Sequence, residues 1–145
     1  MKEIEFTIVD FQSEKYLQTV ELRREILRRP LGIDFSEEQL AKENADIHLV
    51  GLLDNQVIAC LILTPEVNHK IKMRQVAVDQ RFQSQGVGKN LIAFAEKTAR
   101  MNGFLYMHCN ARETAVAFYL KNGYLKSGDV FHEVNLPHYY MSKML

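Results

Sequence analysis

Hydrophobic and polar residues alternate at the start of the chain, and the pattern then changes to that of helices. Glu3–Val9 alternates with the period of two that predicts a half-buried strand. Ser13 is a preferred helix N-cap, and the apolar spacing after it predicts a helix that continues until Pro30. Ser36 begins a second, short helix, because Gln39 stands three residues later in the spacing of a capping box.

The middle of the chain has the pattern of a β-meander. His48–Leu53 and Gln56–Thr64 are rich in Val, Ile and Leu and are joined by Asp54-Asn55, two residues that tolerate the left-handed conformation of a tight hairpin turn. Lys70–Asp79 is the third strand of this meander.

The second half of the chain predicts a β-α-β unit. Gly86–Arg100 has apolar residues every four positions on one face, and Gly103 is placed to end that helix. The strand Phe104–Cys109 follows at once, so it should run parallel to the strand before the helix. These elements indicate the α/β (α+β) class. The remaining elements are a helix, Thr114–Lys121, and two extended runs, Tyr124–Val134 and His138–Lys143, separated by Pro137.

Composition narrows the class of protein. With 145 residues and no linker or repeat, residues 1–145 should form a single domain. Eighteen basic and eighteen acidic residues give a formal net charge of zero, which argues against nucleic acid as a partner. No run is long and apolar enough for a membrane span and no leader is visible, so we expect a cytoplasmic protein. Cys60 and Cys109 have no metal or disulfide spacing and are expected to be buried free thiols, with no metal site.

The stretch from Val76 to Lys89 carries the most chemical information. A strand leads into a polar loop and then into a helix that begins with Gly86 and Gly88, so backbone N–H groups at the helix start are accessible to a phosphate. A P-loop is excluded, because Gln83 stands where its first glycine belongs and Asn90 where its hydroxyl residue belongs. A dinucleotide-binding fingerprint is excluded by the missing third glycine.

This stretch resembles the [RQ]xxGx[GA] signature of the GCN5-related N-acetyltransferase (GNAT) family, here Gln83-Ser84-Gln85-Gly86-Val87-Gly88. Two further features support the resemblance. The preceding strand ends in Val76-Ala77-Val78, and a later block runs from Asn110 through Tyr119 to Gly123-Tyr124. The resemblance extends over residues 48 to 125 and is weaker at both ends.

The resemblance implies a fold, a cosubstrate and roles for particular residues. The fold is a mixed, splayed sheet of about six or seven strands flanked by about four helices. The cosubstrate is acetyl-CoA, with its pyrophosphate on the loop Gln83–Lys89. The pantetheine arm would lie along Val76, Ala77 and Val78 and would be held by Asn110 from the facing strand. Tyr119 would be the general acid, since a phenol of pKa about 10 is protonated at neutral pH and can donate to a thiolate of pKa about 8.5.

The acceptor is expected to be a small-molecule or peptide amine, which attacks acetyl-CoA directly in a ternary complex. Arg23 and Arg24 on the first helix, together with His138 in the tail, are candidate substrate-binding residues. The general base stays open among Glu25, Glu133, His132 and His138. Asn110 is as well suited to capping the following helix as to holding the cosubstrate. A non-catalytic acyl-CoA sensor or scaffold is the alternative function, and a homodimer could form through the sheet edge of the tail.

Overall fold

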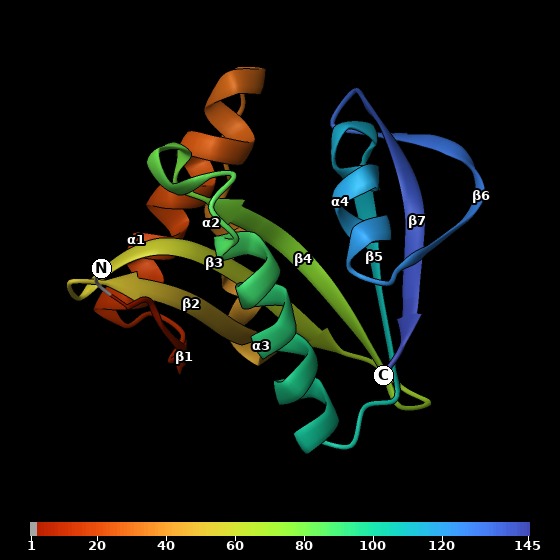
Figure 1. Cartoon of the computed structure of the whole chain (residues 1–145). Helices are drawn as coiled ribbons and strands as arrows, with labels where there is room; N and C mark the ends of the chain where they lie inside the picture. The colour runs from red at the N-terminus through yellow and green to blue at the C-terminus, as the bar shows by residue number, and fades with distance from the viewer. Residues whose placement is uncertain (1–2) are drawn as a thin grey trace.

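The protein is built on one seven-stranded sheet. In the computed structural model, which describes residues 3–145, the strand order is β1-β2-β3-β4-β5-β7-β6 (Figure 1). Each strand that the sequence predicts is present, and so are the four helices, which confirms the mixed sheet. The strands are β1 Glu5–Val9, β2 Ile47–Leu53, β3 Gln56–Pro65, β4 Lys70–Val78, β5 Tyr106–Arg112, β6 Leu125–Glu133 and β7 Leu136–Met144. The α-helices are α1 Glu14–Arg23, α2 Glu37–Ala41, α3 Val87–Met101 and α4 Val116–Lys121.

The β4–β5 pair divides the sheet into two halves. It is parallel, as the β-α-β pattern predicts, whereas the other neighbouring strands are antiparallel. Its ladder covers only Lys70–Lys72 of β4 against Tyr106–His108 of β5. The two strands meet near the C-terminus of the chain and diverge from there, as Figure 1 shows. The remaining length of each strand therefore has a main-chain edge that the partner strand does not pair.

The helices cover both faces of the sheet. Leu49 of β2 packs in a core cluster with residues of α3 and α4, while its neighbour Val50 packs with Leu22 of α1. Successive residues of a strand point to opposite faces, so α3 and α4 lie on one face and α1 on the other. Leu91 of α3 is fully buried, which stabilises the fold by about 1.5–3 kcal/mol.

The first helix changes its winding before Pro30. Ser13 caps α1, its Oγ accepting from the Tyr16 N–H, as predicted. The α-helix ends at Arg23, however, and continues as a π-helix over Arg24–Arg28 and a 3₁₀ turn over Arg29–Leu31. The predicted helical stretch is therefore present, but Pro30 does not end it, because this residue lies inside the final 3₁₀ turn. π-Helical turns are rare and are frequently found at functional sites.

The predicted hairpin turn and capping box are present, whereas the predicted break between the tail strands is not at Pro137. Asp54 and Asn55 have φ of 50° and 64°, as the hairpin requires, and the predicted capping box of Ser36 and Gln39 is present. Pro137 does not separate the tail strands. It lies inside β7, and the turn between β6 and β7 is instead Val134-Asn135, both with positive φ.

The strand β6 forms one edge of the sheet, and most of its residues are exposed. Pairing of two subunits through this edge stays a prediction. Within residues 3–145, no helix is long and apolar enough to cross a membrane.

Candidate active site

A cavity of about 690 Å³ lies where β4 and β5 separate. Its wall includes residues of the π-helix, of both separating strands, of α4 and of the β6–β7 turn. Gln83, in the loop between β4 and α3, also lines it. The cavity therefore connects the loop before α3 with the π-helix, which lies on the other face of the sheet.

The loop after β4 is shaped by residues in the left-handed conformation. Ser84 has φ of 63° and Gly86 has φ of 83°, with Gln85 between them at negative φ. Such alternation turns successive backbone N–H groups toward one side and forms an anion-binding concavity. Gln83 and Gln85 donate their side-chain amides to the Val78 and Arg81 carbonyls at 3.0 and 3.2 Å, so both glutamines hold the loop in shape.

The start of α3 leaves its first amides without helical partners. Gly86 is the N-cap and offers no side-chain cap, and the helix's first hydrogen bond runs from Asn90 N–H to Gly86 C=O. The amides of Val87, Gly88 and Lys89 precede that bond. Val87 is buried, whereas Lys89 is exposed beside the loop. A 15-residue helix adds a dipole that favours an anion at this end.

Gly86 and Gly88 differ in what an added side chain would meet. A Cβ at Gly86 would meet nothing within 4 Å, so this position requires glycine for its positive φ. A Cβ at Gly88 would lie 3.4 Å from Cζ of Phe118, an ordinary van der Waals contact, so the packing of α4 against α3 does not by itself require glycine here. The expectation that both glycines leave space for a phosphate stays a prediction.

A β-bulge in β4 faces the cavity, and sequence reasoning did not find it. Gln75 and Val76 together oppose Leu61 of β3, and Gln75 has φ of 56°. Both residues line the cavity, and the Gln75 Oε1 atom is buried without a hydrogen-bond partner among the described residues. Ala77 and Val78 are back in register with β3. Glutamine has no preference for this conformation, so the sequence offers no signal for the bulge.

Tyr119 lies in the cavity wall with 6% of its surface exposed. Its ring makes edge contacts with Phe118 and Tyr124 at centroid distances of 5.3 and 5.5 Å. Burial raises the pKa of the Tyr119 phenol far above its usual value, and the neighbouring Cys109 thiol raises it further. The phenol therefore stays protonated. Cys109 also lines the cavity, and burial raises the pKa of its thiol to about 12.

Three polar side chains of the cavity wall lie close together. Asn110 Nδ2 donates to Glu133 Oε1 at 3.1 Å, and Glu133 Oε2 lies 3.6 Å from His138 Nε2. His138 is 4% exposed and contacts the Leu136 carbonyl through Nδ1 at 2.8 Å. A carbonyl only accepts, so Nδ1 carries the proton and the neutral ring has its lone pair on Nε2. Asn110 does not cap the next helix, because β5 continues to Arg112.

Two of the four base candidates lie in the cavity wall. Glu133 and His138 line the cavity. Glu25 lines a smaller pocket with Asp79, and His132 on β6 does not line the cavity.

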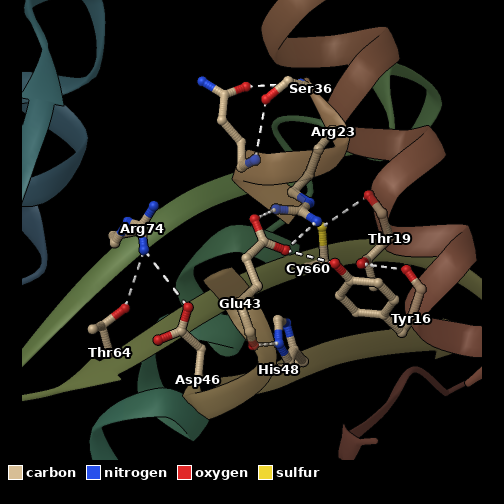
Figure 2. A network of polar contacts seen from close by, with 11 residues as sticks. Tyr16, Thr19, Arg23, Ser36, Glu43, Asp46, His48, Cys60, Thr64 and Arg74 are labelled. Carbon is tan, nitrogen blue, oxygen red and sulfur yellow. Dashed lines mark hydrogen bonds and ion pairs between the residues drawn. The ribbon is translucent and has the colours of Figure 1, made fainter. Parts of the chain in front are cut away.

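Arg23 and Arg24 lie outside the cavity. Arg23 is fully buried and donates two hydrogen bonds of 2.9 Å to Glu43, which also accepts from the Tyr16 hydroxyl (Figure 2). Arg24 pairs with Asp34 at 2.8 Å on the surface. The predicted substrate role of these two arginines therefore finds no support in their positions.

Three other arginines line the cavity instead, Arg74 of β4 among them. Arg28 ends the π-helix and Arg112 ends β5, and both are half-buried in the wall. The spacing of residues in the sequence gives no sign of the π-helical turn that carries Arg28.

The family model for the acetyltransferase (GNAT) domain matches residues 21–145. The chain belongs to the GNAT acetyltransferase family. GNAT acetyltransferases use acetyl-CoA, so this protein is an acetyl-CoA-dependent N-acetyltransferase with acetyl-CoA as its cosubstrate. No group of three or more potential metal ligands occurs within residues 3–145.

Individual relatives are distant. The chain is 25% identical over 119 residues to the uncharacterized N-acetyltransferase YitI of Bacillus subtilis (strain 168), covering 78% of this chain and 80% of YitI. A putative N-acetyltransferase from Lactobacillus plantarum has a TM-score of 0.86 at 22% identity, with 98% of each chain covered. A GNAT acetyltransferase from Elizabethkingia anophelis, with acetyl-CoA bound, has a TM-score of 0.76 at 15% identity, with 98% of each chain covered. These two structures confirm the GNAT fold.

Proposed function

We propose that this GNAT enzyme transfers the acetyl group to the amine of a small molecule or peptide by direct attack in a ternary complex. The observation that carries the proposal is one cavity that reaches from the loop before α3 to the opposite face of the sheet, with Tyr119 in its wall. Cosubstrate and acceptor can then enter from opposite faces and meet where the strands separate.

The cosubstrate is held mostly by main-chain groups. Amides of the loop Gln83–Lys89 bind the pyrophosphate, supported by the N-terminal end of α3. The pantetheine arm pairs with the edge of β4 at Val76 and Val78, an edge that β5 leaves unpaired beyond Lys72. Asn110 faces that edge from β5 and closes the arm's binding site.

Tyr119 is the general acid of the proposed reaction. The amine nitrogen forms a bond to the thioester carbon, and the C–S bond breaks as the tetrahedral intermediate collapses. Tyr119 gives its proton to the departing thiolate. The raised pKa keeps the phenol protonated at neutral pH, so its hydroxyl is available to the sulfur as the C–S bond breaks. The same raised pKa opposes full ionisation of the phenol, so the proton moves only as negative charge develops on the sulfur in this buried site.

Glu133 and His138 form the base that prepares the amine. An ammonium group must lose a proton before it attacks, and the lone pair of His138 Nε2 and the carboxylate of Glu133 face each other across 3.6 Å. Either group accepts the proton, and Asn110 holds Glu133 in position.

Initial-velocity measurements test the direct attack. Thiol release from acetyl-CoA is followed with a panel of primary amines, and both substrates are varied for an amine that is acetylated. Direct attack predicts intersecting double-reciprocal lines. Parallel lines would show an acetyl-enzyme and overturn the proposal, and so would acetyl-CoA binding with no turnover across the panel, the behaviour of a sensor domain.

The base is tested by removing its members one at a time. Glu133→Gln and His138→Gln should each lower kcat by about 10²-fold or more, with the loss smaller at high pH where the amine is already deprotonated. Glu25→Gln is the matched control and should retain wild-type kcat. Equal pH profiles for the wild type and both variants would contradict the assignment.

A further inference from the structure

The cationic side chains of the cavity are poorly balanced by acidic ones. The chain as a whole is neutral, yet among residues 3–145 Glu133 is the single carboxylate in the wall. One of the cations, Arg74, lies 3.6 Å from Asp46 and is partly compensated there (Figure 2). The cations of the wall are Arg28, Lys72, Arg74 and Arg112.

Arg28 and Arg112 converge on one neutral oxygen. Arg28 Nη1 and Arg112 Nη2 both donate to the Leu27 carbonyl, at 3.2 and 3.0 Å. Among the described residues, no carboxylate lies within ion-pair distance of either guanidinium. Each guanidinium has five donors, and one of each is used in these bonds. Two unpaired guanidinium groups at one point form a site for an anion.

Holding these two charges together is unfavourable without a ligand. Burial lowers the pKa of Arg28 below its usual value, and the neighbouring Arg112 lowers it further. Burial likewise lowers the pKa of Arg112. Both groups remain charged at neutral pH. An anion between them would relieve the repulsion and accept paired hydrogen bonds from planar guanidinium donors.

The phosphates of acetyl-CoA do not account for this site. Leu27, which precedes Arg28, packs in the core cluster on the α1 face of the sheet. The loop that accepts the pyrophosphate leads into α3, whose residues pack on the opposite face. The arginine pair therefore belongs to the side from which the acceptor enters.

We propose that the acceptor is an amine that also carries an anionic oxygen group, a carboxylate or a phosphate, and that Arg28 and Arg112 bind this group. The inference rests on the proposed function, because it places the acceptor in the cavity beside Tyr119 and Glu133. The bound anion fixes the amine relative to the thioester, and amines that lack the anion are discriminated against.

Matched pairs of amines test the inference. L-Phenylalanine, L-tyrosine, L-leucine and O-phosphoethanolamine are compared with phenethylamine, tyramine, isoamylamine and ethanolamine by thiol release from acetyl-CoA. We expect kcat/KM to be at least about 10-fold higher for the anionic member of an accepted pair. The amino acids and the phosphate compound separate the two sources of the anion. Equal or higher activity with the amines that lack the anionic group overturns the inference.

Substitution of each arginine tests whether Arg28 and Arg112 cause the preference for anionic amines. Arg28→Gln and Arg112→Gln should each bring the ratio within a pair close to one, while the KM for acetyl-CoA changes by less than about twofold. Arg29→Gln, an exposed neighbour outside the cavity wall, should keep the wild-type ratio. Arg28 also lies 4.5 Å above the Phe35 ring. A purely structural role would lower Tm and slow both members of a pair equally, which would also overturn the inference.

A binding measurement decides the matter if no amine in the panel is acetylated. N-Acetyl-L-phenylalanine and its amide are added to CoA-saturated protein, and Tm is recorded. We expect the carboxylate to raise Tm in the wild type but not in Arg28→Gln. No difference between carboxylate and amide would overturn the inference, whereas failure of CoA itself to bind would overturn the proposed function.

Discussion

Arg23 of α1 and Glu43, in the segment before β2, form a two-point ion pair with both distances at 2.9 Å and with side chains 0% and 4% exposed. Tyr16 donates its hydroxyl to the same carboxylate (Figure 2). Removing one partner of a buried pair leaves the other charge without compensation. Glu43→Gln should therefore lower the free energy of unfolding by about 3–5 kcal/mol, measured by urea denaturation at pH 7.

The pH dependence of this loss has a defined sign. Burial alone raises the pKa of Glu43, but the hydrogen bonds and charge of Arg23 outweigh it, and the pKa lies below its usual value. A carboxylate with a lowered pKa stabilises the fold above the unfolded pKa of about 4.3 and loses that contribution as pH falls through its folded pKa. The difference between wild type and Glu43→Gln should shrink as pH falls below about 4. A difference that grows there would contradict the account. Glu38→Gln, at an exposed ion pair, is the control.

Gly86 and Gly103 offer a matched test of the loop. Their φ angles are 83° and 84°, and a Cβ at either position meets nothing within 4 Å. Alanine at each should cost a similar amount of stability, about 1–2 kcal/mol, because only the backbone conformation is strained. Gly86→Ala should in addition weaken CoA binding about 10-fold or more, since it disturbs the amides that take the pyrophosphate.

Calorimetric titration of both variants with CoA provides the comparison. Gly103→Ala, at the other end of α3, should bind CoA as the wild type does. Equal CoA affinities of the two variants would mean that the loop amides do not carry the cosubstrate.

The two thiols should take no part in the chemistry. Burial raises the pKa of Cys60 and of Cys109 to about 12, so hardly any thiolate exists at neutral pH. Neither thiol should react with a disulfide reagent in the folded protein at pH 7.5. The Cys60→Ala/Cys109→Ala double variant should retain turnover. Loss of turnover with an unchanged Tm would point to a thioester intermediate.

Helices and strands were predictable from the sequence where apolar spacing and the turn or cap residues indicate the same element. The helix α3 combines apolar spacing with a glycine at each end, and the β2–β3 hairpin has turn residues that tolerate positive φ. The loop Gln83–Lys89 was identified because bare helix amides and glycines are visible in a sequence. Each of these features depends on residues close together in the chain.

The acceptor side depends on contacts that are distant in sequence. Arg28 and Arg112 are brought to the Leu27 carbonyl by the π-helical turn and the extra length of β5. Arg23 was expected at the substrate because a helix face does not reveal a buried partner, and Glu43 lies 20 residues away. Long-range pairing of this kind has no signature in residue spacing.

Tyr119 and Tyr124 allow the most direct test of the mechanism. The two rings lie 5.5 Å apart, but the Tyr124 hydroxyl donates to Glu96 at 2.9 Å and does not line the cavity. Tyr124→Phe should lower Tm and leave kcat close to the wild-type value, whereas Tyr119→Phe should keep CoA affinity and lose about 10²–10⁴-fold in kcat. The measurement is kcat for acetyl transfer in both variants, with CoA affinity determined in parallel. Wild-type kcat in folded, CoA-binding Tyr119→Phe would contradict the account.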